Sequence, residues 1–297
     1  MIEVKNLTVK YPNKKGIFDL NFSVNQGEVM GYLGPNGAGK TTTIRALLGF
    51  MNPNNGTATI GGMDCWHQAT EIQKTLGYIP GEINFLDGMS GDEFLKFMHE
   101  MRNTKDITYQ KQLLEMFELN PKGKIKKFSK GMKQKLGIVT AFMHNPNVLI
   151  LDEPTSGLDP LMQNRFVELL LSEKAKGKTI LMSSHMFEEI EKTCDNVLII
   201  KDGRIIKQSD VQTLKTAQRK GFILRTTDIH NLVQALQSEN FEIGTIHNNS
   251  VEVFVSAHNV DRLIKTAANF TISNFDIKVQ TLEDIFMQFY GKEEKPL

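Results

Sequence analysis

The clearest chemical feature of the sequence is a glycine-rich run that ends in a lysine and a threonine. Residues 34–41, Gly-Pro-Asn-Gly-Ala-Gly-Lys-Thr, match the G-x-x-x-x-G-K-[ST] pattern of a phosphate-binding loop. Glycines let backbone N–H groups close around a phosphate at the positive end of the following helix. Lys40 can then neutralise β- and γ-phosphate oxygens, and the Thr41 hydroxyl can bind Mg²⁺. The predicted nucleotide contacts are Asn36, Gly37, Ala38, Gly39, Lys40, Thr41 and Thr42.

A second candidate site is a pair of carboxylates at the end of an apolar run. Residues 148–151 read Val-Leu-Ile-Leu, and Asp152 and Glu153 follow directly. Two carboxylates at the end of a buried strand are costly unless they meet a cation. Asp152 is therefore predicted to be a partner of the Mg²⁺ ion. Glu153 is then placed to polarise the attacking water, as a general base or water-orienting group.

Further motifs resemble those of the ABC-type ATPases. Residues 128–132, Phe-Ser-Lys-Gly-Met, are similar to the signature sequence of that family, and residues 156–159, Ser-Gly-Leu-Asp, look like its D-loop. His185 lies where the switch histidine is found, and Tyr11 matches the aromatic residue that stacks on adenine. The motifs follow the order of the family and cover roughly residues 1–208.

The resemblance implies ATP as the ligand, Mg²⁺ as the cofactor, and hydrolysis as the reaction. It also implies that ATP is held between two ATPase domains, so that each signature serves the nucleotide of the opposite subunit. The helix that begins after Ser129 would offer its N–H groups and dipole to that γ-phosphate. His185 would hold the γ-phosphate and the attacking water, and Asp159 is the D-loop residue. The signature residues assigned to the opposite ATP are Ser129, Lys130, Gly131 and Met132.

Two departures from the family pattern affect the expected contacts. Lys130 and Met132 stand where glycine and glutamine are usual, although Ser129 remains to contact phosphate. Gly81 stands where a glutamine is expected in the Q-loop. A glycine cannot bind Mg²⁺ through a side chain, so water or Glu82 would complete the metal shell.

A run of lysines before and within the signature has two interpretations. It could contact nucleic acid or anionic lipid, or it could be a solvated helical face whose nearest lysines help to bind ATP phosphates. The second interpretation is favoured. The run comprises Lys122, Lys124, Lys126, Lys127, Lys130, Lys133 and Lys135.

The elements that must position these motifs follow an α/β pattern. Strands are expected at 28–33, 57–60, 148–151 and 179–183, with a helix from about 40 to 50. The strands at 148–151 and 179–183 are near-continuous apolar runs, as in a parallel sheet that is covered on both sides. A hairpin is expected over 196–206, because Asp202-Gly203 separates two apolar runs.

A helical subdomain is expected from about residue 83 to 140. Ser90-Gly91-Asp92-Glu93 fits a capping box, which predicts a helix from this point. We expect Phe94, Phe97, Met98 and Met101 to share one face of this helix.

A second, smaller α+β domain is expected over 220–297, after a polar boundary near residues 208–220. Its strands and helices alternate in the β-α-β-β-α-β order of a ferredoxin-like domain. A last helix is predicted from Leu282 to Phe289. The stretch 281–286, Thr-Leu-Glu-Asp-Ile-Phe, resembles tails found on the ATPases of bacterial ABC-2-type exporters.

Composition limits the remaining function classes. The chain has 297 residues, 40% of them hydrophobic and 23% charged, with a net charge of +1. This net charge gives no overall electrostatic field that would attract nucleic acid. No stretch of the sequence is apolar enough to span a bilayer. Its two cysteines, Cys65 and Cys194, form no CxxC pair, which suits a reducing compartment. The chain is therefore expected in the cytoplasm, peripheral to the inner face of the cell membrane.

The expected function is that of an ATP-hydrolysing subunit that powers a membrane ABC transporter. The favoured role is export of a hydrophobic drug or an amphipathic, antimicrobial peptide. The expected partners are a separate polytopic membrane subunit and a second ATPase subunit, identical or paralogous. Nucleic acid is not expected as a partner. Two alternatives remain open: a non-transport ABC ATPase that acts on the ribosome or on nucleic acid, and a nucleotide sensor without turnover.

Overall fold

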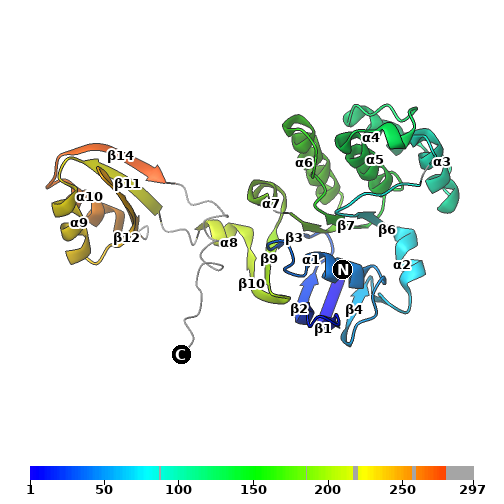
Figure 1. The fold of residues 1–297 in the computed structure, drawn as a ribbon, viewed down its shortest axis with the longest axis horizontal. Helices are drawn as coiled ribbons and strands as arrows, with labels where there is room; N and C mark the ends of the chain where they lie inside the picture. Colours follow the sequence, from blue (N-terminus) through cyan, green and yellow to red (C-terminus); the bar gives the residue numbers. More distant parts are fainter. Residues whose placement is uncertain (87, 185, 217–219, 256–258, 279–297) are drawn as a thin grey trace. The chain divides into compact units, whose positions relative to one another are not determined.

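The computed structural model divides into two compact units, Met1–Val211 and Gln212–Leu297 (Figure 1). The residues it describes are 1–86, 88–184, 186–216, 220–255 and 259–278. His185 and the helix predicted from Leu282 to Phe289 therefore lie outside the described residues. None of the described helices combines the length and the apolar character that a bilayer crossing requires.

A six-stranded sheet forms the centre of the first unit, in the order β10-β9-β3-β8-β7-β6. The strands from β9 to β6 run parallel, and β10 pairs with β9 as an antiparallel edge. The apolar runs predicted as buried parallel strands are β7 and β8, and they lie side by side. The strands are β3 (Val29–Leu33), β6 (Leu76–Ile79), β7 (Val148–Asp152), β8 (Thr179–Ser183), β9 (Asn196–Lys201) and β10 (Arg204–Asp210).

A second sheet of the first unit is antiparallel, in the order β2-β1-β4-β5. Burial alternates along β1, as expected for a sheet with one face on the core. Apolar residues of both sheets, such as Leu7 and Ile150, join in one core cluster. The sequence pattern predicts only one of these strands, at 57–60. The strands are β1 (Ile2–Lys10), β2 (Gly16–Val24), β4 (Asn55–Ile60) and β5 (Met63–Asp64).

Helices connect the strands and form the helical part expected between residues 83 and 140. The longest of them, α6, begins with Asp159 as its N-cap and Pro160 in its first turn. The helices are α1 (Lys40–Leu47), α2 (Ala69–Thr75), α3 (Gly91–Met101), α4 (Thr108–Met116), the 3₁₀ turn η1 (Ile125–Lys127), α5 (Lys130–Phe142), α6 (Pro160–Ala175), α7 (Phe187–Thr193) and α8 (Val211–Thr216).

The capping box predicted at the start of α3 is confirmed. The Ser90 hydroxyl accepts from the Glu93 N–H, and the Glu93 carboxylate accepts from the Ser90 N–H. The four apolar residues expected on one face all lie on α3, and Met101 among them is 69% exposed. Phe94 is buried, and its buried companions are Leu95 and His99.

The second unit has the predicted β-α-β-β-α-β order. Its sheet is antiparallel, in the order β12-β13-β11-β14, and a separate apolar core lies between the sheet and the two helices. The ferredoxin-like prediction is confirmed. The elements are β11 (Lys220–Thr226), α9 (Ile229–Ser238), β12 (Glu242–His247), β13 (Ser250–Val255), α10 (Val260–Ala267) and β14 (Ile272–Lys278).

Candidate functional site

The phosphate-binding loop lies between β3 and α1, as the motif requires. Gly39 is the N-cap of α1 with φ +115°, a backbone conformation that side chains disfavour. A Cβ atom built at Gly39 would lie 2.8 Å from the Ile17 side chain, so only glycine fits this turn. Since a glycine cannot cap a helix with a side chain, the N–H groups of the first turn remain available for an anion.

This loop borders a cavity of about 900 Å³. Six of the seven predicted nucleotide contacts line it, together with both carboxylates and Tyr11. Ala38 does not; it is 4% exposed, and its carbonyl accepts from the Gly203 N–H at 2.9 Å. Residues on the cavity wall include Tyr11, Asn36, Gly37, Gly39, Lys40, Thr41, Thr42, Gly81, Glu82, Asn84, Asp152 and Glu153.

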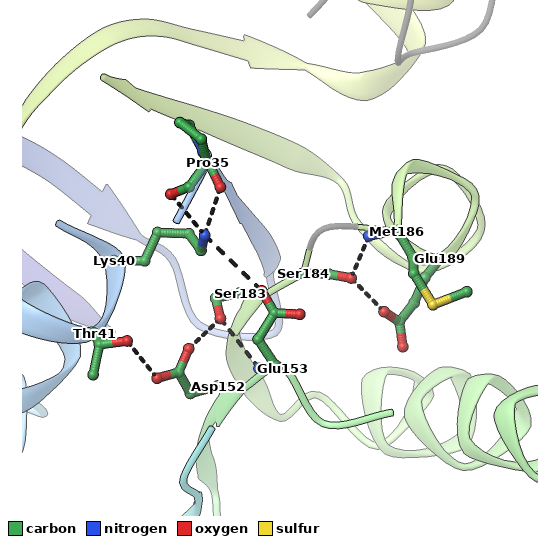
Figure 2. A network of polar contacts seen from close by, with 10 residues as sticks. Pro35, Lys40, Thr41, Asp152, Glu153, Ser183, Ser184, Met186 and Glu189 are labelled. Carbon is green, nitrogen blue, oxygen red and sulfur yellow. Dashed lines mark hydrogen bonds and ion pairs between the residues drawn. The ribbon is translucent and has the colours of Figure 1, made fainter. Parts of the chain in front are cut away.

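Lys40 is a buried cation at the floor of the cavity. It is 7% exposed, and its Nζ donates to the carbonyl oxygens of Gly34 and Pro35. Nζ lies 3.9 Å from Glu153 Oε1 (Figure 2). Burial lowers the pKa of Lys40, and the nearby Glu153 and Asp152 carboxylates oppose that shift. A phosphate at this position would add negative charge beside an ammonium group that is partly desolvated.

The two predicted metal ligands meet at the same place. Thr41 Oγ1 donates to Asp152 Oδ2 at 2.9 Å, and Ser183 Oγ donates to Asp152 Oδ1 (Figure 2). A hydroxyl and a carboxylate beside a phosphate loop are the ligand types that Mg²⁺ takes when phosphates and water complete its shell. No cluster of three acidic, histidine or cysteine ligands occurs in the described chain, so the protein alone forms no closed metal cage. The residues therefore fit Mg²⁺ that arrives with a nucleotide.

Glu153 is held in an uncommon backbone conformation. Its φ is +51°, and its N–H donates to both the carbonyl and the hydroxyl oxygen of Ser183, at 3.1 and 3.2 Å. Ser183 thus orients Asp152 and Glu153 at once, because β7 and β8 pair Asp152 with Ser183. The sequence interpretation did not assign Ser183 a role. The signal was present, since Ser183 ends the second buried apolar strand.

Tyr11 lies at the cavity wall and contacts the first helix. Its hydroxyl lies 3.5 Å from Thr42 Oγ1 and 3.3 Å from Met51 Sδ. These contacts fix the position of the phenol group beside the phosphate loop. Its predicted stacking on adenine stays a prediction.

The signature residues lie elsewhere. Ser129 is exposed and caps α5, where its Oγ accepts from the Met132 N–H at 3.1 Å. Asp159 caps α6 in the same way, by accepting from the Met162 N–H at 3.0 Å. Within the part of the chain that the structure describes, neither the signature nor Asp159 lines the cavity of the same subunit.

The lysine run before the signature is largely solvated. Residues 122, 124, 126, 127 and 130 are exposed. Lys124 pairs with Glu93 at 3.2 Å and donates to the Gly88 carbonyl at 2.8 Å.

Gly81 lies against Asp152, a predicted metal ligand. A Cβ atom built at Gly81 would be 3.3 Å from Asp152 Oδ2, a close but not prohibitive approach. Glu82 and Asn84, which follow it, also line the cavity and are exposed. The expected glutamine position is therefore next to the predicted metal ligand Asp152, and two other oxygen-bearing side chains line the same cavity.

A polar cluster flanks the position of His185, which itself lies outside the described residues. Glu189 on α7 is 4% exposed, and its carboxylate accepts from Ser184 Oγ at 2.6 Å (Figure 2). The same carboxylate oxygen accepts from Thr155 Oγ1 at 3.4 Å. Ser184 and Glu189 were missed from sequence. No signal in the sequence distinguishes Glu189, because Glu188 and Glu191 are acidic neighbours of the same kind.

Comparisons with known proteins show the family to which the chain is similar. A sequence profile described as ABC transporter matches residues 17–156. The bacitracin transport ATP-binding protein of Bacillus licheniformis is 34% identical over 98% of this chain and 97% of its own length. The linearmycin resistance ATP-binding protein of Bacillus subtilis is 29% identical over 98% of this chain and 99% of its own length.

Solved structures agree as well. An ATP-binding subunit of an ABC transporter superposes with a TM-score of 0.68 at 32% identity, over 73% of this chain and 92% of that chain. A dimeric bacterial ABC transporter cassette shares the fold, with a TM-score of 0.65 at 21% identity over 71% of this chain and 99% of that chain. The chain therefore belongs to the ABC transporter family, as an ATP-binding subunit that hydrolyses ATP.

Proposed function

We propose that this chain powers the export of a hydrophobic drug or an amphipathic, antimicrobial peptide through a separate membrane subunit. The similarity to proteins of bacitracin transport and linearmycin resistance supports this cargo class. A Nod factor export ATP-binding protein of Burkholderia lata, 37% identical over 70% of each chain, supports the direction of transport. The chain would then act in the cytoplasm, at the inner face of the membrane.

ATP would be sandwiched between two such chains, or between this chain and a paralogous subunit. The observation that carries this proposal is the separation of the cavity from the signature. Lys40, Thr41 and both carboxylates gather at one cavity, while Ser129 and Asp159 lie outside it. A second subunit would bring its signature, the start of its α5, to the exposed side of the bound triphosphate.

Within each site, Glu153 would act as the general base for the attacking water. Its carboxylate is close to the Lys40 ammonium, which would hold the β- and γ-phosphates. Thr41 and Asp152 would hold Mg²⁺, which neutralises phosphate charge when it is bound. His185 would hold the γ-phosphate, a role that rests on the family resemblance.

The first test is phosphate release by the Glu153→Gln variant with Mg²⁺ and ATP. Loss of a general base is expected to lower kcat by about 100-fold or more, since base catalysis contributes about 10² to 10⁴ in rate. Glu188→Gln is the matched control, because Glu188 is exposed and pairs with Lys192 of the same helix at 2.8 Å, away from the cavity. Unchanged turnover in Glu153→Gln would refute the assigned base.

The same variant tests the sandwich and the partner. With ATP this variant should form a dimer that light scattering detects, because bound ATP is no longer hydrolysed. Added to detergent-solubilised native membranes, the ATP-bound variant should capture a polytopic membrane protein in stoichiometric yield. Recovery of ribosomal proteins or nucleic acid in its place would refute the transport role.

A further inference from the structure

A buried hydrogen bond ties the signature helix to the turn that carries Glu153. Gln134 lies on α5, five residues after Ser129, and is 4% exposed. Its Nε2 donates to the Pro154 carbonyl at 2.6 Å, and Pro154 directly follows Glu153. A buried amide group needs a hydrogen-bond partner, so this contact fixes the position of α5 relative to the turn after Glu153.

The same helix contacts the turn at a second point. A Cβ atom built at Gly131 would lie 3.1 Å from the Gly157 carbonyl oxygen. One built at Gly157, where φ is +82°, would lie 2.9 Å from Cδ of Lys130. The first turn of α5 is therefore packed directly on the chain that leads away from Glu153.

The turn itself is short and internally bonded. The Ser156 N–H donates to the Glu153 carbonyl at 3.1 Å, and the Leu158 N–H donates to the Thr155 carbonyl at 3.0 Å. Ser183 holds the Glu153 N–H from the strand side. The hydrogen bond from Gln134 restrains the main chain on the C-terminal side of Glu153, at the Pro154 carbonyl.

We propose that Gln134 is a positioning residue for hydrolysis. It holds the main chain next to Glu153 against α5, and so sets the direction of the catalytic carboxylate. This inference rests on the proposed function, in which Glu153 activates water in one ATP site while the start of α5 contacts the other ATP. In each subunit of the dimer, Glu153 is then anchored to α5 of the same subunit. The start of that α5 contacts the ATP bound by the other subunit.

Gln134→Met tests the inference, because methionine has nearly the same length but no N–H donor. Misplacing a reacting group by about 1 Å can cost about 100-fold in rate, so kcat should fall by about ten-fold to 100-fold. KM for ATP should stay within about two-fold, because the phosphate loop is unchanged. A raised KM with an unchanged kcat, or no change in either, overturns the proposal.

Gln163→Met is the matched control. Gln163 Nε2 donates to the Leu158 carbonyl at 3.2 Å, a bond of the same kind to the same turn but farther from Glu153. Its kcat should stay near that of the unsubstituted chain. Equal losses in both variants would indicate general loosening of the turn and would overturn the proposal.

A second variant, Gln134→Glu, serves if the methionine variant does not fold. Burial raises the pKa of an introduced carboxyl, and only its protonated form can donate to the Pro154 carbonyl. Its kcat relative to the unsubstituted chain should rise as the pH is lowered. A ratio that is constant with pH overturns the proposal.

Dimer formation separates this inference from the function on which it rests. Gln134→Met combined with Glu153→Gln should still dimerise with ATP, because Ser129 and the phosphate loop remain. If Glu153→Gln alone stays monomeric with ATP, the sandwich fails. If it dimerises but Gln134→Met hydrolyses ATP normally, only the role of Gln134 fails.

Discussion

At the scale of single residues, Gly81 is the position where the chain departs most from the expected chemistry. It lies beside Asp152, and its backbone is in a region that other residues adopt. Gly81→Gln would place an amide oxygen next to the metal-binding carboxylate. We expect the Mg²⁺ concentration for half-maximal ATP hydrolysis to fall, because Mg²⁺ prefers oxygen ligands.

Mg²⁺ titrations of ATP hydrolysis check this expectation. Gly81→Leu is the control, since leucine adds similar bulk but no oxygen. An equal Mg²⁺ dependence in Gly81→Gln and the unsubstituted chain would show that this position does not contribute to the metal shell.

Residue chemistry was predictable where it depends on a short contiguous motif. The position of the phosphate loop, Asp152 and Glu153 beside one cavity could be predicted, because each belongs to a short motif at the end of an apolar run; their roles stay predictions. Ser183 and Gln134 could not be assigned. Their roles arise when β7 pairs with β8 and when α5 packs on the turn after Glu153, and both contacts join segments distant in sequence.

At the scale of elements, a buried ionic cluster joins α4 to α6 and β8. Glu173 on α6 is 0% exposed and pairs with Lys178, which is 5% exposed. The Tyr109 hydroxyl on α4 donates to Glu173 Oε1 at 2.7 Å, and Lys176 lies 5.0 Å from the centre of the Tyr109 ring. The cluster connects the helical segment to the central sheet of the first unit.

Glu173→Gln is expected to destabilise the first unit by about 3 kcal/mol, because it leaves a buried lysine without its counter-charge. Urea unfolding followed by circular dichroism measures this change. Glu168→Gln on the same helix is the control, since Glu168 is exposed and pairs weakly with Arg165 at 3.9 Å. Similar unfolding free energies for the two variants would contradict a stabilising role for the cluster.

His144, just after α5, is expected to make the free energy of unfolding depend on pH. Burial lowers its pKa to about 4, and the nearby Arg102 adds to the shift. Its Nε2 lies 3.2 Å from the Leu76 carbonyl, a contact in which the imidazole donates. The unfolded chain binds a proton near pH 6.5 whereas the folded chain binds it near 4, so stability is lost as pH falls through that window.

His144→Gln should remove up to about 3 kcal/mol of the loss between pH 6.5 and 4, because glutamine can donate to Leu76 but does not titrate there. Urea unfolding at a series of pH values compares the variant with the unsubstituted chain. Parallel pH profiles would show that His144 is not the group that titrates.

Helices and strands could be predicted where a single sequence pattern, such as a capping box or an apolar run, marks them. They were harder to predict where tertiary packing decides which residues are buried. The capping box placed α3 correctly, and the apolar runs placed β7 and β8. Met101 follows the helical period of α3 but is exposed, because it is the last residue of the helix and extends past the packed surface. The strands β1 and β2 were not predicted, although Leu20, Phe22 and Val24 alternate with polar residues. In β1 the alternation is interrupted, because the pairing with β2 shifts register between Val4 and Leu7.

At the scale of the whole molecule, the two units have separate cores. One core cluster spans residues 2–200, and the other spans residues 222–267. Among the described residues, those that line the nucleotide cavity all belong to the first unit. A ligand that binds one unit should stabilise that unit alone, unless the two unfold together.

We therefore expect two calorimetric transitions for Glu153→Gln, a variant that should retain bound ATP. ATP and Mg²⁺ at about 100 times Kd should stabilise the first unit by about 2.7 kcal/mol, which raises its Tm by about 5–11 °C, since each kcal/mol is worth about 2–4 °C in a unit of this size. The transition of the second unit should stay in place. Adding Lys40→Met to the variant should abolish the shift, because the phosphate loop loses its cation. A single transition that moves as a whole would mean that the two cores unfold as one unit, and the boundary near residue 211 would then not separate independent domains.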